Sequence, residues 1–295
     1  MENEKIVADG MQSSVDRRAF VKRAGLVTAG IAGAAVVGGK LGMLDQIPGT
    51  KKAGLAAASV NAAAITDVDI LNFALNLEYL EAEFYTVATT GKNISQIGIA
   101  TSGSGNPGNT YGGKRVFFGG DEWWEDSTVK RIAEGIAFDE QQHVKFLRAA
   151  LGSYVIAKPA INLDALGIGF EDFRQFLVLA RAFEDTGVSA YGGAAPLITS
   201  KDYLAAAARI ALTEALHSGN IRKLIQGHFI KTSKLDSQDI LPPPSGTQFF
   251  EVDSNALAIV RTTSEVLAIV FGSSKTGTNA GAFFPNGVNG TINTV

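Results

Sequence analysis

Apolar side chains recur with the 3.6-residue period of an α-helix in four segments, each about 20 residues or longer. A helix in the first segment can begin at Thr66 or Asp67, and Gly91 ends it. The other segments are 126–150, 170–192 and 200–227. Helices of this length are about 30 Å long. Four of them predict an all-α fold, a four-helix bundle. One stripe of the first helix contains Leu71, Leu75, Glu78, Ala82 and Tyr85.

The connections between these segments are long. The connection 91–125 is rich in glycine, and 152–169 can cross the bundle lengthwise at up to about 3.3 Å per extended residue. A fifth helix is expected at 254–271, after three prolines at 242–244 that no helix interior accommodates. The Gly- and Asn-rich tail after it is expected to be coil. The stretch GSGNPG at 103–108 matches a dinucleotide fingerprint in form only, because no strand precedes it and no helix follows.

The N-terminus reads as a targeting segment and not as part of the fold. Residues 14–22, SVDRRAFVK, precede the apolar stretch 24–39, and this order resembles a twin-arginine export signal. Small residues at 56–58 and 62–64 suit a cleavage site. An N-terminal membrane anchor is the alternative, but the apolar stretch is poor in Leu and Phe for a membrane span. Stable membrane insertion after cleavage is therefore not expected.

These features divide the chain into three parts. Residues 1–58 are a signal peptide and spacer, 59–230 are the four-helix bundle, and 231–295 are a C-terminal extension with the fifth helix and the coil tail. The likeness to a twin-arginine signal implies export to the periplasm or the extracellular space. It also implies a route that carries folded proteins, often with their cofactor inserted.

Composition excludes several classes of site and partner. The chain has no cysteine, which excludes disulfides, thiolate zinc sites and a lipid-anchored cysteine. The net charge is −3, and no long basic run lies outside the N-terminus, so nucleic-acid binding is not expected.

Two of the three histidines follow a glutamate by three residues. These pairs are Glu140/His143 and Glu214/His217. Residues three apart share one face of a helix, so each pair can present a carboxylate and an imidazole in the same direction. His228 has no such partner and is interpreted as a surface or capping residue. The alternative for the pairs is an ordinary solvated helix surface.

Single glutamates on the other two helices favour a metal site. Glu78 lies on the apolar stripe of the first helix, and Glu184 lies in the apolar sequence LVLARAFEDTG of the third. Four buried carboxylates are costly unless cations compensate them. Oxygen and nitrogen donors without thiolates suit Fe or Mn. One Glu from each of two helices and Glu-x-x-His from each of the other two is the pattern of dimetal carboxylate bundles. We therefore expect two metal ions, Fe or Mn.

The same motifs occur twice along the chain. Tyr85 follows Glu78 by seven residues, and Tyr191 follows Glu184 by seven. The order E-x6-Y and then E-x-x-H is thus present in helices one and two and again in helices three and four. This repetition predicts a pseudo-symmetric bundle with one metal for each half.

These residues resemble the ferritin-like superfamily. LNFALNLEYLEAEFY is similar to helix one of bacterioferritins, and 66–230 resembles the exported ferritin-like family that includes desiccation-related proteins. The resemblance implies that Glu78 and Glu184 are terminal ligands and that Glu140 and Glu214 bridge two metals. It also implies that His143 and His217 each bind one metal.

Some details depart from the bacterioferritin pattern or stay open. That pattern has Asp before each Glu-x-x-H, whereas this chain has Asp139 in helix two but Thr213 in helix four. Such an aspartate orients a histidine ligand, so one histidine is expected to be less well supported. Glu81, one turn from Glu78, is an alternative ligand. Tyr85 and Tyr191 are expected to donate to carboxylates or to pack in the core.

The resulting functional hypothesis is a di-iron or di-manganese oxidoreductase that acts on a small oxidant, O₂ or peroxide, in stress protection. Catalase-like and ferroxidase-like activities are not separable from these residues. The alternative is a non-enzymatic desiccation- or stress-related structural protein. A 24-subunit iron-storage cage is disfavoured by the long insertion 91–125 and the extension 230–295. The sequence leaves a homo-oligomer open.

Overall fold

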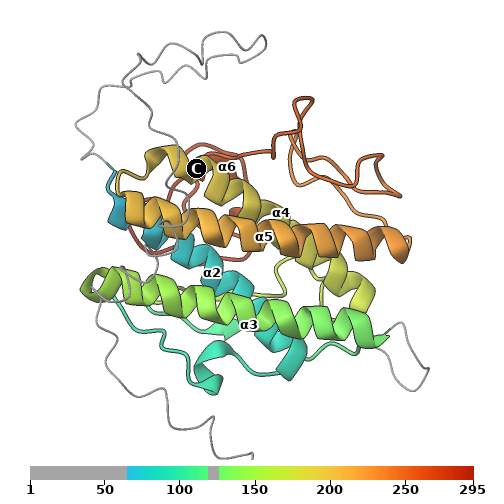
Figure 1. The fold of residues 1–295 in the computed structure, drawn as a ribbon. Coiled ribbons are helices and arrows are strands. Elements are labelled where there is room, and N and C mark those ends of the chain that lie inside the picture. Colours follow the sequence, from blue (N-terminus) through green and yellow to red (C-terminus); the bar gives the residue numbers. More distant parts are fainter. Residues whose placement is uncertain (1–64, 119–125) are drawn as a thin grey trace, which may run out of the picture.

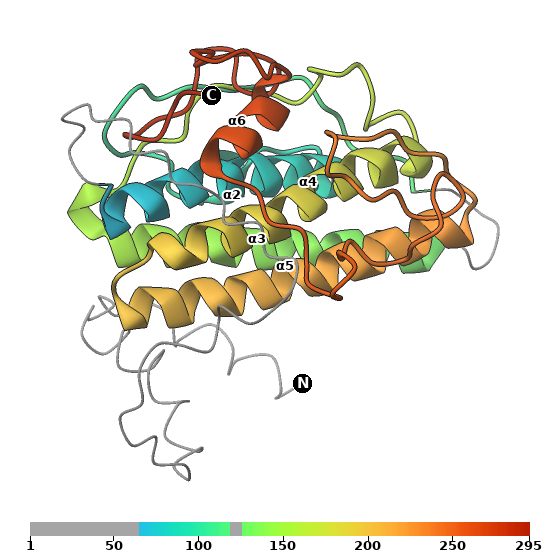
Figure 2. The same ribbon diagram turned by 90° about the horizontal axis from the view of Figure 1, so that it is seen from above.

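Four long helices lie side by side in the computed structural model, which describes residues 65–118 and 126–295 (Figures 1 and 2). They are α2 (Asp67–Thr90), α3 (Asp126–Leu151), α4 (Phe173–Ala194) and α5 (Lys201–Gly227). α2 packs mainly against α3, and α4 against α5. We call these the first and second helix pairs. The predicted all-α four-helix bundle is confirmed, while the predicted export signal lies outside the described residues.

Local sequence explains where the long helices begin and end. The Thr66 side chain accepts a hydrogen bond from the Asp69 amide, the Asp69 carboxylate accepts one from the Thr66 amide, and Gly91 ends α2 with φ 75°. α4 begins at Phe173 and not near Phe170, because the Asp172 carboxylate caps the amides of the first turn. Among the described residues, no helix is long and apolar enough to span a membrane.

α3 ends at one end of the bundle and α4 begins at the other, so the crossover between them runs the length of the bundle (Figure 1). It contains β2 (Ile161–Asn162), which pairs in parallel with β1 (Thr110–Tyr111) from the first connection. A Cβ at Gly103 or Gly108 would overlap the backbone of Ile156 or Ala160. The glycines of GSGNPG thus allow two loops to touch. Short 3-10 helices occupy Ile94–Ile97, Gly152–Tyr154 and Ala195–Leu197.

The fifth helix, α6 (Thr263–Phe271), is half as long as predicted, so the expectation of a helix from residue 254 was wrong. The Asp253 carboxylate accepts hydrogen bonds from the amides of Asn255 and Leu257 and holds a turn there. The helix starts only where Thr262 and Glu265 form a capping box.

The C-terminal tail has no helix, as expected, but it is packed against the bundle. Asn289 and Asn76 of α2 exchange two hydrogen bonds between backbone and side chain, of 2.8 and 3.1 Å. Phe283 and Phe284 of the tail are buried. The tail therefore covers one side of α2.

Candidate metal centre

The bundle brings together the six residues predicted as metal ligands, with one helix supplying each Glu or Glu/His set. All six are buried, and the four glutamates are fully inaccessible. Their donor atoms form two groups in which all atoms lie within 4.8 Å of one another. The first group is Glu78, Glu140, His143 and Glu214, and the second is Glu140, Glu184, Glu214 and His217. Glu140 and Glu214 belong to both groups and thus lie between them.

Both histidines direct Nδ1 into this cluster. His143 Nδ1 lies 3.2 Å from Glu78 Oε2, 3.2 Å from Glu140 Oε2 and 3.3 Å from Glu214 Oε1. His217 Nδ1 lies 3.1 Å from Glu140 Oε1 and 3.3 Å from Glu184 Oε2. Each imidazole therefore faces one carboxylate from the partner helix of its own pair and at least one shared carboxylate.

Many of these buried donor atoms have no hydrogen-bond partner among the described residues. They are Oε1 of Glu140, both carboxylate oxygens of Glu184 and of Glu214, and Nδ1 of His217. Buried polar atoms are normally hydrogen-bonded, and orphaned ones need an explanation. Carboxylate oxygens and imidazole nitrogens converge here, and no hydrogen-bond donor of the described residues meets these atoms. Such a set of donor atoms fits two first-row divalent cations. The residues present therefore fit a dimetal centre.

Electrostatics within the cluster show how much charge is concentrated there. Burial and the charge of Glu78 raise the pKa of Glu140 to about 7. Burial and the charge of Glu140 raise the pKa of Glu214 well above its ordinary value. Burial disfavours the charged form of His217, but its contacts with Glu140 and Glu184 outweigh burial and raise its pKa to about 12. The carboxylates repel one another, and the two histidines together with the Tyr191 hydroxyl offset part of this repulsion.

Asp139 orients a histidine of the other helix pair. Its Oδ2 lies 3.1 Å from His217 Nε2, and this contact favours a proton on Nε2 and directs Nδ1 at the cluster. Thr213, at the matching position of α5, donates instead to the Arg209 carbonyl at 3.2 Å. The structure therefore identifies His143 as the less supported histidine, a point that the sequence left open.

The two tyrosines also reach across the bundle. Tyr191 of α4 donates a hydrogen bond of 2.5 Å to Glu78 Oε1 of α2. The Tyr85 hydroxyl is fully buried, and burial together with the charge of Glu184 raises its pKa well above the ordinary value. It nevertheless makes no hydrogen bond of normal geometry. Tyr191 thus positions the carboxylate of Glu78, and Tyr85 lies near the carboxylate of Glu184.

Glu81, the alternative ligand on α2, also lies inside. It is 4% exposed, yet it belongs to neither group of converging donor atoms. Glu81 and Glu78 are therefore both internal, and Glu78 is the one within reach of the histidines. Sequence reasoning missed Gly187, which follows Glu184 as Glu81 follows Glu78. Aligning the first glutamates of the two repeats, Glu78 and Glu184, would have placed Gly187 opposite Glu81.

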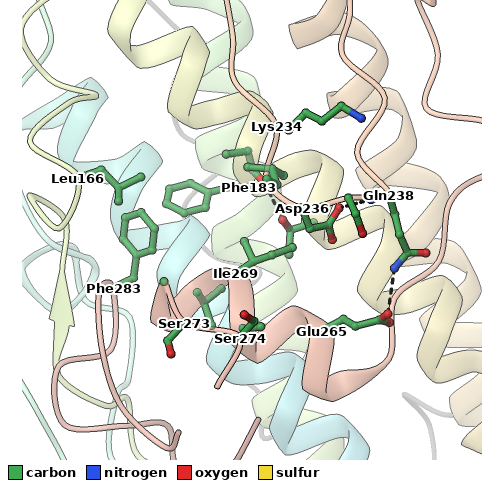
Figure 3. A pocket seen from close by; sticks show the side chains of 17 residues that line it. Leu166, Phe183, Lys234, Asp236, Gln238, Glu265, Ile269, Ser273, Ser274 and Phe283 are labelled. Atoms are coloured by element: carbon green, nitrogen blue, oxygen red, sulfur yellow. Dashed lines mark hydrogen bonds between the residues drawn. The ribbon is translucent and has the colours of Figure 1, made fainter. Parts of the chain in front are cut away.

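A separate cavity of about 640 Å³ lies between α4, α6 and the segment 234–238 (Figure 3). Phe183 and Phe283 lie on its apolar side, and several of its polar groups bind other protein groups. Gln238 donates to Glu265 at 2.9 Å, and Asp236 pairs with Arg261. None of the six cluster residues lines this cavity.

Fold and site together define a ferritin-like protein with a buried carboxylate and histidine cluster. The Ferritin-like domain model matches residues 66–227, which is more than half of the chain, so the chain belongs to this family. The chain is also similar to the ferritin-like catalase Nec2 of Nesocodon mauritianus. The two are 22% identical over 274 residues, covering 77% of this chain and 84% of the relative.

Proposed function

We propose that the protein is a dimetal oxidoreductase that decomposes peroxide. The observation that carries the proposal is the pair of four-residue groups sharing Glu140 and Glu214, with orphaned donor atoms directed between them. Glu78 and His143 would hold one metal, Glu184 and His217 the other, and the two shared glutamates would bridge them. Either Fe or Mn suits these donors. When bound, the pair supplies reversible one-electron or two-electron exchange with a small oxygen species.

The surrounding residues perform the positioning. Tyr191 fixes the orientation of Glu78, and Asp139 fixes the tautomer of His217. Complete burial of the four glutamates keeps bulk water away and strengthens each electrostatic interaction in the cluster. Only a molecule as small as peroxide or O₂ suits a site enclosed in this way.

The similarity to a protein described as a catalase favours peroxide over the alternative substrate, O₂. Disproportionation of two hydrogen peroxide molecules yields two water molecules and one O₂, so it needs no other reductant. Such a reaction is compatible with an exported protein, since no cytoplasmic electron donor is required. Export by the twin-arginine route, with the metals inserted before transport, is part of this proposal.

The test is metal analysis and O₂ evolution from peroxide on the same sample of full-length protein. We expect two Fe or Mn per chain, with turnover. Glu140→Ala and His217→Ala should lose metal and turnover together. Glu134 is an exposed glutamate on the same helix as Glu140, and Glu134→Ala should lose neither. Protein with no metal, or the same stability and metal content in the cluster variants, would exclude the proposal and favour a structural role in stress protection.

A further inference from the structure

Glu81 is a buried carboxylate with no evident structural purpose. Neither an ion pair nor a hydrogen bond to another described residue holds it. Glu83, two residues away, shows what a structural carboxylate on α2 looks like. It is equally buried, but it pairs with Lys158 at 3.4 Å and accepts a hydrogen bond of 3.1 Å from the Ile94 amide. Glu81 has no such compensation.

The surroundings of Glu81 are the metal cluster itself. Glu81 Oε1 and Glu214 Oε2 lie beside the same glycine, Gly187. Burial, and then the negative charges of the four cluster glutamates, raise the pKa of Glu81 well above its ordinary value. A fifth carboxylate among four others is costly unless a cation lies near. The histidines already face the other four glutamates, so Glu81 is the carboxylate for which the protein provides no cation.

Gly187 of α4 provides the space for this carboxylate. A Cβ at Gly187 would overlap Glu214 Oε2 and lie 3.1 Å from Glu81 Oε1, so both oxygens border the same small space. In the repeated motif, Gly187 matches Glu81. At matching positions, the first helix pair thus has a carboxylate and the second helix pair has no side chain.

We propose that Glu81 is a seventh protein ligand of the metal pair, and that Gly187 provides the space in which its carboxylate reaches the metals beside Glu214. This inference rests on the proposed dimetal centre. It makes the centre asymmetric, with five carboxylates and two imidazoles.

The test uses cobalt(II) as the probe, in wild-type protein stripped of metal and in Glu81→Gln and Gly187→Ala variants. We expect the wild type to bind two Co²⁺. Glu81→Gln should still bind two, with one affinity reduced at least about tenfold. Its d–d absorption should become more intense, because losing a ligand lowers the coordination number. Gly187→Ala should change the same band. Gly219→Ala is the control, since a Cβ there meets nothing within 4 Å.

The outcomes separate this inference from the proposed function. Wild-type protein that binds two Co²⁺, with unchanged affinity and spectrum in Glu81→Gln, would overturn the seventh ligand and leave the dimetal centre intact. A weaker affinity with an unchanged spectrum would also overturn it, because that pattern reports only a lost charge nearby. Wild-type protein that binds no metal would overturn the proposed function itself. Circular dichroism of each variant confirms that the fold is retained.

Discussion

The first helix pair, α2 and α3, and the second, α4 and α5, carry the same site residues at the same spacing but support them differently. The first pair has Asp139 and Glu81 where the second has Thr213 and Gly187. Support also crosses between the pairs, since Asp139 contacts His217 and Tyr191 contacts Glu78. Repetition of the ligand motif therefore does not produce two equivalent metal positions.

The outer faces of the two pairs differ as well. α2 is joined to the tail by the uncharged amides of Asn76 and Asn289. α4 is joined to the C-terminal extension by charge, since Arg181 contacts both Asp185 and Asp239, and Arg222 contacts Asp185 at 2.8 Å. Stability of the second pair should therefore depend on pH more than that of the first. Asp185, the residue next to Glu184, is thus linked to the extension through Arg181 and Arg222.

The largest effect is expected from removing a shared carboxylate. Glu140→Ala takes a ligand from both positions, so we expect the metal content to fall from two ions per chain to none. Glu184→Ala affects one position only and should leave up to one ion. Metal analysis after dialysis measures both. Equal losses in the two variants would contradict the division into shared and terminal carboxylates.

The next effect concerns the histidine supports. Asp139→Ala should weaken metal binding at the His217 position about 10- to 100-fold, because the imidazole loses the partner that fixes its tautomer. Thr213→Ala should have little effect, since Thr213 bonds its own helix. Thr213→Asp should strengthen the His143 position. Stepwise metal titration measures all three, and a loss in Asp139→Ala at the His143 position would refute the crossed arrangement.

A smaller effect is expected from the tyrosines. Tyr191→Phe leaves a Glu78 oxygen without its donor, which should cost about 1–3 kcal/mol of folding or metal-binding free energy. Tyr85→Phe removes a hydroxyl that makes no hydrogen bond of normal geometry to the described residues, so its effect should be near zero. Thermal unfolding with and without metal gives both values. Equal effects would show that Tyr85 supports Glu184 after all.

The smallest effect tests the charged network of the second pair. Burial and the charge of Asp185 raise the pKa of Glu251 to about 8, despite the opposing charge of Arg261. The pKa is higher in the folded state, so the stabilisation is complete below the unfolded pKa and is lost as pH rises through 8. Denaturant unfolding should show the free energy of unfolding of the wild type falling relative to that of Glu251→Gln as the pH rises from 5 to 8. Parallel pH profiles of the wild type and Glu251→Gln would argue against a raised pKa of Glu251.

Much of the bundle could be predicted from the sequence, because helical periodicity and local stop signals such as Gly91 and Gly152 are properties of short segments. The proximity of the six cluster residues could be predicted for the same reason, since each Glu-x-x-His pair shares a helix face. Their roles as ligands stay predictions. The helix expected from residue 254 was wrong because side chains fix a turn at Asp253, and a hydrophobic pattern does not register a turn of this kind.

Other features depended on contacts between distant segments. Nearly every residue of α2 from Ile70 to Thr89 is buried, so no apolar stripe could decide between Glu78 and Glu81. Which histidine Asp139 supports depends on how α3 packs against α5. The charged network around Asp185 joins residues from three separate segments. No local pattern predicts such pairings.

The crossed support of the histidines has a consequence for the origin of the repeat. In a symmetric dimer of two α2–α3 units, the aspartate of each subunit would support the histidine of the other, so both histidines would be held. In a dimer of two α4–α5 units, neither would be held, because Thr213 stands in place of the aspartate. The first unit thus contains the aspartate that two copies would need to hold both histidines, whereas the second unit lacks it and relies on the first.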